Sequence, residues 1–237
     1  NVVHYTLELS ESVTGHRYDS CISSVPLSTL FARKDEVLEI IGDVEGKLII
    51  KEYPTKTASV NTIKNHLEKL KKRNHKIDMI IVDYADLLRP SRNFREKREE
   101  LGSIYEDLRA VAQENKCPIW TASQTNRTGL NAEVVTMESI SEAFNKCFVA
   151  DFICSLSRTV QDKQANKGRV FIAKNRNGPD GLVFQAFVDW SNVSIKVLSR
   201  EGEEAVSSVI QDSAENTLQF MRERFKKKIN NNERYRC

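Results

Sequence analysis

The stretch MIIVDYADLL, residues 79–88, decides how the rest of the chain is interpreted. Four apolar residues, Met79 to Val82, lead directly into Asp83. A short unbroken apolar run of this kind predicts a strand that is buried on both faces of a parallel sheet. An ionised carboxylate is costly to bury without a partner, so Asp83 is expected at the C-terminal end of the strand, facing a crevice. In open α/β sheets this is the edge at which ligands bind.

An apolar strand that ends in Asp has the form of a Walker B element, whose Asp organises Mg²⁺ beside nucleotide phosphates. Many parallel strands end in Asp for structural reasons alone. The stretch by itself therefore leaves a nucleotide site and a structural carboxylate both open, and the rest of the chain has to decide between them.

The composition suits one fairly large soluble globular domain, with 237 residues, 40% of them hydrophobic and 29% charged. No apolar run approaches the ~20 residues that a membrane span needs. The net charge of +3 does not by itself imply a nucleic-acid partner. The chain opens at Asn1, within an apparent strand, and this indicates a fragment or a start after a cut or splice point.

The five cysteines are scattered and contain no CxxC pair, which indicates reduced thiols in a cytosolic compartment. The four histidines show no ligand spacing with cysteine, so a zinc site is not expected.

Two further predicted strands end in polar side chains that resemble Asp83 in position. Val2 to Leu7 reads as a strand followed by Glu8, and PIWTAS, residues 118–123, reads as a strand followed by Gln124. All three groups are expected at one crevice. Two structural alternatives remain, since Glu8 could simply solvate a strand end and Gln124 could satisfy loop backbone.

The remaining pattern predicts helices between strands and an antiparallel finish. Helices are expected from Ser10 or Ser12 to about residue 24, over 27–41, after Ser59, over 99–115 and over part of 137–149. Strands are expected at 47–53, from Asp151, and at 169–173, 183–188 and 194–198. A polar turn is expected at 161–167.

Two basic segments could meet an anionic target. The loop 88–98 holds Arg89, Arg92 and Arg95 around Phe94, and a flexible basic loop at the ligand edge could hold a phosphodiester backbone. Its charges could equally pair with the neighbouring glutamates. In the turn KNRNGPDG, residues 174–181, the cations at positions 174 and 176 are two apart and point the same way on extended backbone.

The order of these pieces resembles the RecA-like motor domain of hexameric replicative DNA helicases of the DnaB type, especially its T-even phage relatives. The matching stretches are TLELSE (6–11), KEYPT (51–55), IIVDYADLL (80–88), SQTNR (123–127), the Ala150–Asp151 pair and KNRNGP (174–179). The resemblance covers about residues 1–198 and leaves 199–237 as a helical, basic tail. It implies an α/β fold with a mostly parallel, twisted RecA-like sheet flanked by helices and closed by C-terminal antiparallel strands.

The resemblance also implies roles for five residues. Glu8 matches the carboxylate that polarises the water attacking the γ-phosphate, and Asp83 matches the Walker B Asp that holds Mg²⁺ through its water shell. Gln124 matches the glutamine that senses the γ-phosphate and couples it to DNA. Lys174 and Arg176 match the pair that reaches the γ-phosphate in the neighbouring subunit. ATP and Mg²⁺ are thus the implied cofactors, bound in part by Asp83, Gln124 and Arg176.

The implied partners are single-stranded DNA, further copies of the chain in a hexameric ring, a primase and a helicase loader, without a membrane. Arg89, Arg92, Arg95 and the segment with Lys146 fall where the family places its channel loops, which follow the strand backbone and carry little base specificity.

One departure from the family is serious, because the chain contains no GxxxxGK[ST] phosphate-binding loop. We therefore expect residues 1–237 alone to bind ATP poorly and not to hydrolyse it. A RecA-like recombinase or clock ATPase is a second interpretation, which the KNRNGP turn disfavours. A nucleotide-free module that joins a ring or holds DNA is a third. The missing loop supports that third interpretation, and the retention of all five polar residues opposes it.

Overall fold

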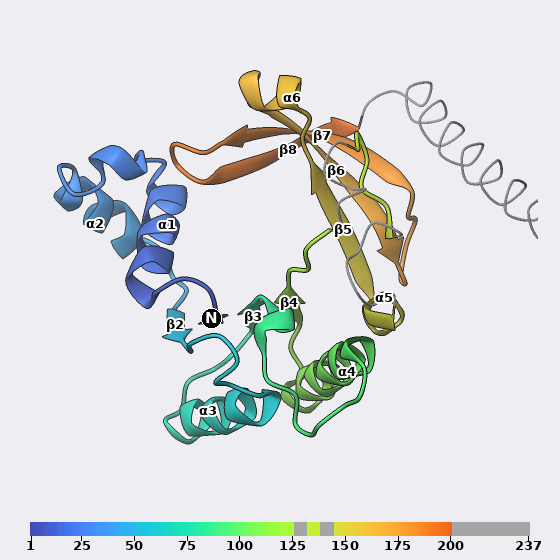
Figure 1. The fold of residues 1–237 in the computed structure, drawn as a ribbon. Coiled ribbons are helices and arrows are strands. Elements are labelled where there is room, and N and C mark those ends of the chain that lie inside the picture. The colour runs from blue at the N-terminus through green and yellow to red at the C-terminus, as the bar shows by residue number, and fades with distance from the viewer. Residues whose placement is uncertain (126–131, 138–144, 201–237) are drawn as a thin grey trace, which may run out of the picture.

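The computed structural model describes residues 1–125, 132–137 and 145–200 and contains two four-stranded sheets (Figure 1). The first is parallel, in the order β2 (Leu48–Glu52), β1 (Val2–Thr6), β3 (Met79–Asp83) and β4 (Ile119–Thr121). The second is antiparallel, in the order β5 (Phe152–Ser157), β6 (Lys167–Asn175), β7 (Leu182–Asp189) and β8 (Ser194–Arg200). The predicted α/β class with closing antiparallel strands is confirmed.

Helices connect and cover the first sheet, as a parallel sheet requires. They are α1 (Glu11–Ser23), α2 (Lys34–Gly42), α3 (Val60–Lys72) and α4 (Lys97–Asn115), with short 3₁₀ turns η1 (Leu27–Thr29) and η2 (Ala85–Leu87). Helix α5 (Asn145–Val149) precedes the second sheet, and α6 (Val160–Gln164) connects β5 to β6 within it. Figure 1 shows α3 and α4 on one side of the first sheet and α1 on the other. No helix in the described ranges is long and apolar enough to cross a membrane.

Side-chain caps fix where two of these helices begin. The Ser10 hydroxyl accepts a hydrogen bond from the Val13 amide, so α1 starts directly after the polar end of β1. Ser59 and Thr62 form a reciprocal capping box at the start of α3. Both caps were expected from the sequence, and the first of them places the start of α1 three residues after Glu8.

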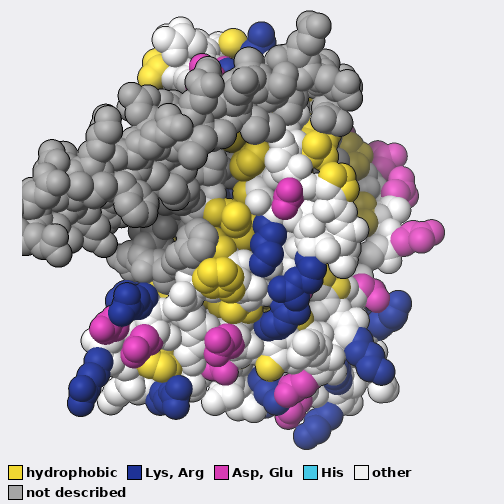
Figure 2. Space-filling model, turned by 90° about the vertical axis from the view of Figure 1, so that its right-hand side faces the viewer, with side chains coloured by type: hydrophobic (Ala, Val, Ile, Leu, Met, Phe, Trp, Pro, Cys, Tyr) yellow, Lys and Arg dark blue, Asp and Glu magenta, His cyan; other side chains and the backbone are white. Residues whose placement is uncertain are grey.

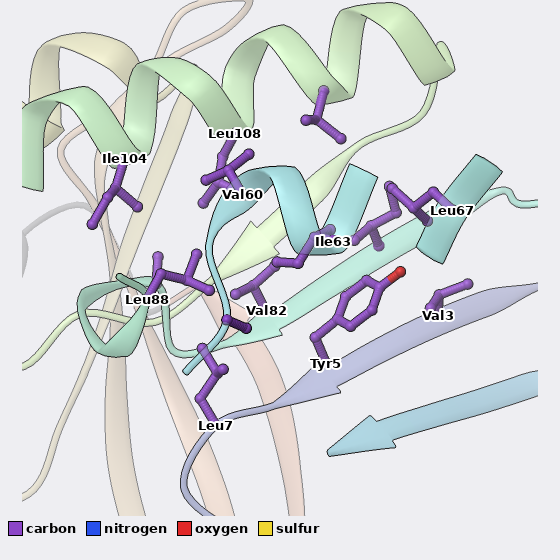
Figure 3. Packing of buried hydrophobic residues seen from close by; sticks show 14 of the residues in the cluster. Val3, Tyr5, Leu7, Val60, Ile63, Leu67, Val82, Leu88, Ile104 and Leu108 are labelled. Atoms are coloured by element: carbon purple, nitrogen blue, oxygen red, sulfur yellow. The ribbon is translucent and has the colours of Figure 1, made fainter. Parts of the chain in front are cut away.

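The main core lies between the first sheet and helices α3 and α4 (Figure 3). Tyr5 and Val82 point from the strands toward Ile63 and Leu67 on α3, and all four side chains are almost completely buried. Ile63, Leu67 and Leu70 recur at i, i+4 and i+7 and form the buried face of this helix. This core holds β1 and β3 in register and thereby fixes their C-terminal ends.

We expect Leu67→Ala to lower the free energy of unfolding by about 2–5 kcal/mol, because it leaves a cavity in close-packed core. Leu67 is only 1% exposed. Leu38 on α2 is 57% exposed and serves as the matched control, whose replacement by Ala should change stability by no more than ~0.5 kcal/mol. Urea unfolding followed by circular dichroism measures both. Equal losses in the two variants would contradict the assignment of this core.

Three sequence-based expectations were wrong in detail. Burial alternates along β3, so Ile80 and Val82 are buried while Met79, Ile81 and Asp83 are only partly buried. The expected helix 27–41 is a 3₁₀ turn followed by α2, because Arg33 takes a non-helical backbone conformation. Most of the expected polar turn 161–167 is helix α6, which a Thr159–Asp162 capping box starts.

Strand β3 is only partly buried because the face of the first sheet opposite the main core is incompletely covered. Residues in register share a face of a sheet, so His4, Ile81 and Trp120 lie together, opposite the main core. Helix α1 reaches His4 through Tyr18, but Trp120 on β4 stays 45% exposed. Among the described residues, that side of β4 therefore has no covering helix.

The two sheets face each other through unpaired edges. β4 ends the first sheet and β5 ends the second, and in the described part of the chain neither outer edge pairs with a strand. The rings of Trp120 on β4 and Phe152 on β5 meet in a T-shaped contact, with centroids 5.8 Å apart, but the two strands themselves are not paired. Exposed sheet edges with apolar neighbours are unusual in a finished domain.

The predictions for the helical tail and for part of 137–149 fall on residues 201–237 and 138–144, outside the described residues. The boundary between the motor domain and the tail therefore stays a prediction.

Candidate active site

The C-terminal edge of the first sheet brings together the three polar groups predicted from its strands. Thr6 lies in register with Asp83, and the Leu7 amide donates to the Asp83 carbonyl at 2.9 Å, so Glu8 leaves β1 directly beside the end of β3. Thr121 on β4 lies in register with Val82, which brings Gln124 out at the same edge. Parallel strands and the core beneath them thus position all three side chains.

Tyr84 connects two of these strand ends and was missed as a site residue in the sequence. The Gln124 side-chain amide donates to the Tyr84 hydroxyl at 2.9 Å. Burial raises the pKa of Tyr84, and the nearby negative charges of Glu8 and Asp86 raise it further, so the phenol is neutral at pH 7. The peptide bond between Asp83 and Tyr84 is cis. Tyr84 could have been found from its place next to Asp83 in the quoted stretch.

The opposite side of Asp83 is closed by α1. The Tyr18 hydroxyl on this helix lies 2.8 Å from Nδ1 of His4, two residues before Thr6, the residue in register with Asp83. Burial lowers the pKa of His4, although the negative charge of Asp83 acts in the opposite direction. His4 is therefore a neutral neighbour that leaves the charge of Asp83 available to a cation.

The donors at this edge fit part of a nucleotide site. The described residues contain no group of three or more histidine, cysteine or acidic side chains that could hold a metal ion by themselves. Mg²⁺ at nucleotide sites needs only one or two carboxylates, together with substrate phosphates and waters, and Asp83 meets that requirement. The element that would bind the phosphate groups of the nucleotide is missing, because the sequence holds no glycine-rich phosphate-binding loop.

Lys174 and Arg176 lie at the end of β6, on the second sheet. The Lys174 ammonium donates to the Cys147 carbonyl at 2.6 Å and to the Phe148 carbonyl at 3.3 Å. Arg176 reaches the same Phe148 carbonyl and forms an ion pair with Asp151 at 3.0 Å. Both cations thus lie on one side of the chain, as their spacing predicts, and both are held by α5 rather than by the edge with Asp83.

The predicted basic loop connects η2 to α4, and its three arginines are exposed. In the described ranges, no ion pair involves Arg89, Arg92 or Arg95, whereas the neighbouring Glu96 pairs with Arg98. The Arg92 guanidinium lies over the Phe94 ring, 4.9 Å from its centroid. Of the two interpretations of this loop, the geometry favours cations available to an anionic ligand.

An open hollow of about 660 Å³ lies between this loop and α5, with Arg92, Phe94, Arg95 and Phe148 among its lining residues. Figure 2 shows the side of the molecule that lies to the right in Figure 1, where basic side chains gather beside hydrophobic ones.

Lys146 differs from the arginines, although it was grouped with them as a DNA contact. Its side chain is only 3% exposed, and its ammonium forms an ion pair with Asp86 at 2.6 Å. It also donates to the Ser123 hydroxyl at 3.1 Å. In this conformation Lys146 faces the protein interior, so a direct contact with DNA is not favoured by the geometry.

The fold is a RecA-like α/β domain in which Glu8, Asp83 and Gln124 lie at the C-terminal edge of the parallel sheet. Solved structures agree on the fold. One, described as an ATPase domain, superposes with a TM-score of 0.72 at 22% identity and covers 84% of this chain and 74% of that one. Another, of a DnaB-like replicative helicase and its interactions with primase, also gives 0.72 at 21% identity, covering 84% and 52%.

Sequence comparison identifies the family. The model of the DnaB-like helicase C terminal domain matches residues 1–196, and the chain belongs to this family. A DnaB-like replicative helicase of Enterobacteria phage T4 is 30% identical over 191 residues, which cover 75% of this chain and 40% of the relative. The replicative DNA helicase DnaB of Geobacillus stearothermophilus is 30% identical over 158 residues, covering 64% and 34%. The chain thus spans well under half the length of these relatives.

Proposed function

We propose that this chain is the C-terminal ATPase portion of a ring-shaped replicative DNA helicase, which unwinds duplex DNA by ATP-driven movement on single-stranded DNA. The observation that carries the proposal is the meeting of Glu8, Asp83 and Gln124 at one sheet edge, in a chain that belongs to the DnaB-like family. Replicative helicases are named among the relatives on both the phage and the bacterial side.

Each residue in the proposed site has a role that its position supports. Asp83 would hold Mg²⁺ through water, and the neighbouring Glu8 would accept a proton from the water that attacks the γ-phosphate of ATP. Gln124, tied to Tyr84, would report the presence of the γ-phosphate to the rest of the sheet. Lys174 and Arg176 would serve the site of the next subunit, which accounts for their place away from this edge.

The proposal requires a phosphate-binding element from outside residues 1–237. The open edges of β4 and β5 and the exposed face of Trp120 give such an element a place to pack, since a parallel sheet is normally covered on both faces. We propose that a strand, loop and helix with the missing GxxxxGK[ST] sequence join the domain there, either in the same polypeptide or from a separately made one.

The proposed function also implies an assembly, partner proteins and a cellular compartment. The assembled protein would form a hexameric ring around single-stranded DNA and would work with a primase and a loader in the cytoplasm of a bacterial or phage-infected cell. One solved relative was determined for its interactions with primase, and that supports a primase as the partner to test first.

Strand displacement tests the proposed function directly. The chain is completed with the GxxxxGK[ST]-bearing segment encoded next to it in its source DNA and is then given a forked duplex with labelled strands. We expect ATP-dependent release of one strand, and none with a non-hydrolysable ATP analogue. ATP hydrolysis that single-stranded DNA does not stimulate, together with no strand release, would argue for a RecA-like ATPase of another kind.

The basic loop is expected to contact the DNA backbone. Replacing both Arg92 and Arg95 with Ala should weaken binding to single-stranded DNA and should lower the slope of log affinity against log salt by about 1.4, from ~0.7 per lost phosphate contact. Arg98 is the matched control, because its charge is already paired with Glu96. Fluorescence anisotropy over a salt series measures both. An unchanged slope in the double variant would remove the loop from the DNA interface.

A nucleotide-free module that supports a ring is the second candidate, and the missing phosphate-binding loop is the one observation that favours it. In that case, the completed protein would bind DNA without hydrolysing ATP.

A further inference from the structure

A partly buried polar cluster ties four segments together behind the candidate site. The Lys146 ammonium on α5 bonds to Asp86, which follows β3, and to Ser123, which follows β4. The Tyr105 hydroxyl on α4 donates to the second Asp86 oxygen at 2.9 Å, and the Lys146 ammonium lies 5.6 Å from the centre of the Tyr105 ring. Burying a charged lysine costs free energy unless an opposite charge compensates it, so the place of Lys146 depends on its ion pair with Asp86.

The same short helix holds the two cations of the second sheet. Cys147 and Phe148 directly follow Lys146, and their carbonyls accept the hydrogen bonds of Lys174 and Arg176. Helix α5 is therefore fixed through Lys146 to the segments that follow Asp83 and precede Gln124, and the carbonyls of its next two residues support the pair at positions 174 and 176. A displacement of Lys146 must move these carbonyls, because α5 has only five residues.

We propose that Lys146 is a positioning residue, whose ion pair with Asp86 sets the place of α5 and thereby aims Lys174 and Arg176 at the neighbouring subunit. The inference rests on the proposed function, in which that pair acts in trans. Lys146 touches neither nucleotide nor DNA in this role. Lys146 connects the ends of β3 and β4 in its own subunit to Lys174 and Arg176, which would act at the nucleotide site of the neighbouring subunit.

Its loss should resemble the loss of the pair itself. In the completed ring, Lys146→Met keeps the length of the side chain and removes its charge. We expect kcat for ATP hydrolysis to fall about 100-fold, as a misplacement of about 1 Å produces, with little change in KM because Glu8, Asp83 and Gln124 themselves are unaltered. The double variant Lys146→Met/Asp86→Asn removes both charges, leaves no uncompensated carboxylate, and should show the same loss in a folded protein.

Subunit mixing distinguishes positioning in trans from damage to the subunit's own site. Glu8→Gln subunits lack the hydrolytic carboxylate but keep an intact cluster and pair. Mixed with Lys146→Met subunits, they should supply a well-placed pair to the neighbouring site and restore part of the turnover. Arg176→Ala subunits mixed with Glu8→Gln subunits provide the reference for rescue, and size-exclusion chromatography confirms that each mixture forms rings.

Each result decides the matter. Rescue of both Lys146→Met and Arg176→Ala supports the inference. Rescue of Arg176→Ala alone would overturn it while leaving the proposed function intact, and so would full turnover by the double variant. Failure of both to be rescued would reject the action of the pair in trans, and the positioning role would fail with it.

Discussion

Glu8→Gln is expected to remove nearly all ATP hydrolysis from the protein completed with its phosphate-binding segment. The expected fall in kcat is about 10²–10⁴-fold, the usual contribution of a general base. Glutamine has almost the same shape as glutamate but cannot accept the proton of the attacking water. ATP binding should persist, because Asp83 and the phosphate-binding segment are unchanged. Steady-state turnover and equilibrium binding of a fluorescent ATP analogue separate the two effects.

Glu11 provides the matched control for that variant. It begins α1 three residues after Glu8, and its carboxylate is already engaged by Lys51 at 3.1 Å and by the Glu52 amide at 2.9 Å. Glu11→Gln should therefore leave turnover within a few-fold of the unaltered protein. If Glu8→Gln kept full activity, or if both variants lost it equally, the hydrolytic role of Glu8 would have to be abandoned.

Arg176→Ala is expected to have an effect of equal or larger size, through the neighbouring subunit. An arginine supplied in trans contributes about 10³–10⁵-fold to kcat in related phosphoryl-transfer enzymes. The loss should be partly reversed when Arg176→Ala subunits are mixed with Glu8→Gln subunits, because mixed rings then contain sites with both groups. The measurement is ATP turnover as a function of the mixing ratio at constant total protein.

Arg109 controls for the ion pair that Arg176 makes within its own subunit. Both guanidinium groups lie 3.0 Å from the same oxygen of Asp151. Arg109→Ala removes one of these contacts, together with the hydrogen bond from Arg109 to the Val149 carbonyl in α5, but leaves Lys174, Arg176 and the carbonyls that they bind in place, so its turnover should stay far above that of Arg176→Ala. Equal loss in the two variants, with no rescue at any ratio, would show that Arg176 matters for local structure rather than for a neighbour's ATP.

The sequence was a good guide to the strand ends and to where helices α1 and α3 begin, and a poor guide to contacts between segments that lie far apart in the chain. Asp83, Glu8 and Gln124 were placed correctly because apolar runs followed by a polar residue report the edge of a parallel sheet. The caps at Ser10 and Ser59 were equally visible, since each depends on local hydrogen bonds. Strand ends and helix caps depend mainly on residues that are close together in the sequence.

Lys146 shows why the rest could not be read in the same way. Only the family resemblance grouped it with the DNA-contacting loops, and only the tertiary fold brings it to Asp86, 60 residues earlier in the chain. The exposed face of Trp120 is a similar case, because strand β4 is apolar in sequence whether or not a helix covers it. Long-range partners decide burial, and a pattern within one segment does not contain them.

The most direct test of the central claim compares ATP turnover by residues 1–237 alone with turnover after the GxxxxGK[ST]-bearing segment is added. A folded preparation, checked by circular dichroism, is assayed with and without single-stranded DNA. We expect no turnover above background from the chain alone, and DNA-stimulated turnover once the segment is present. Robust hydrolysis by residues 1–237 alone would contradict the claim that this chain holds only the hydrolytic and sensing side of the nucleotide site.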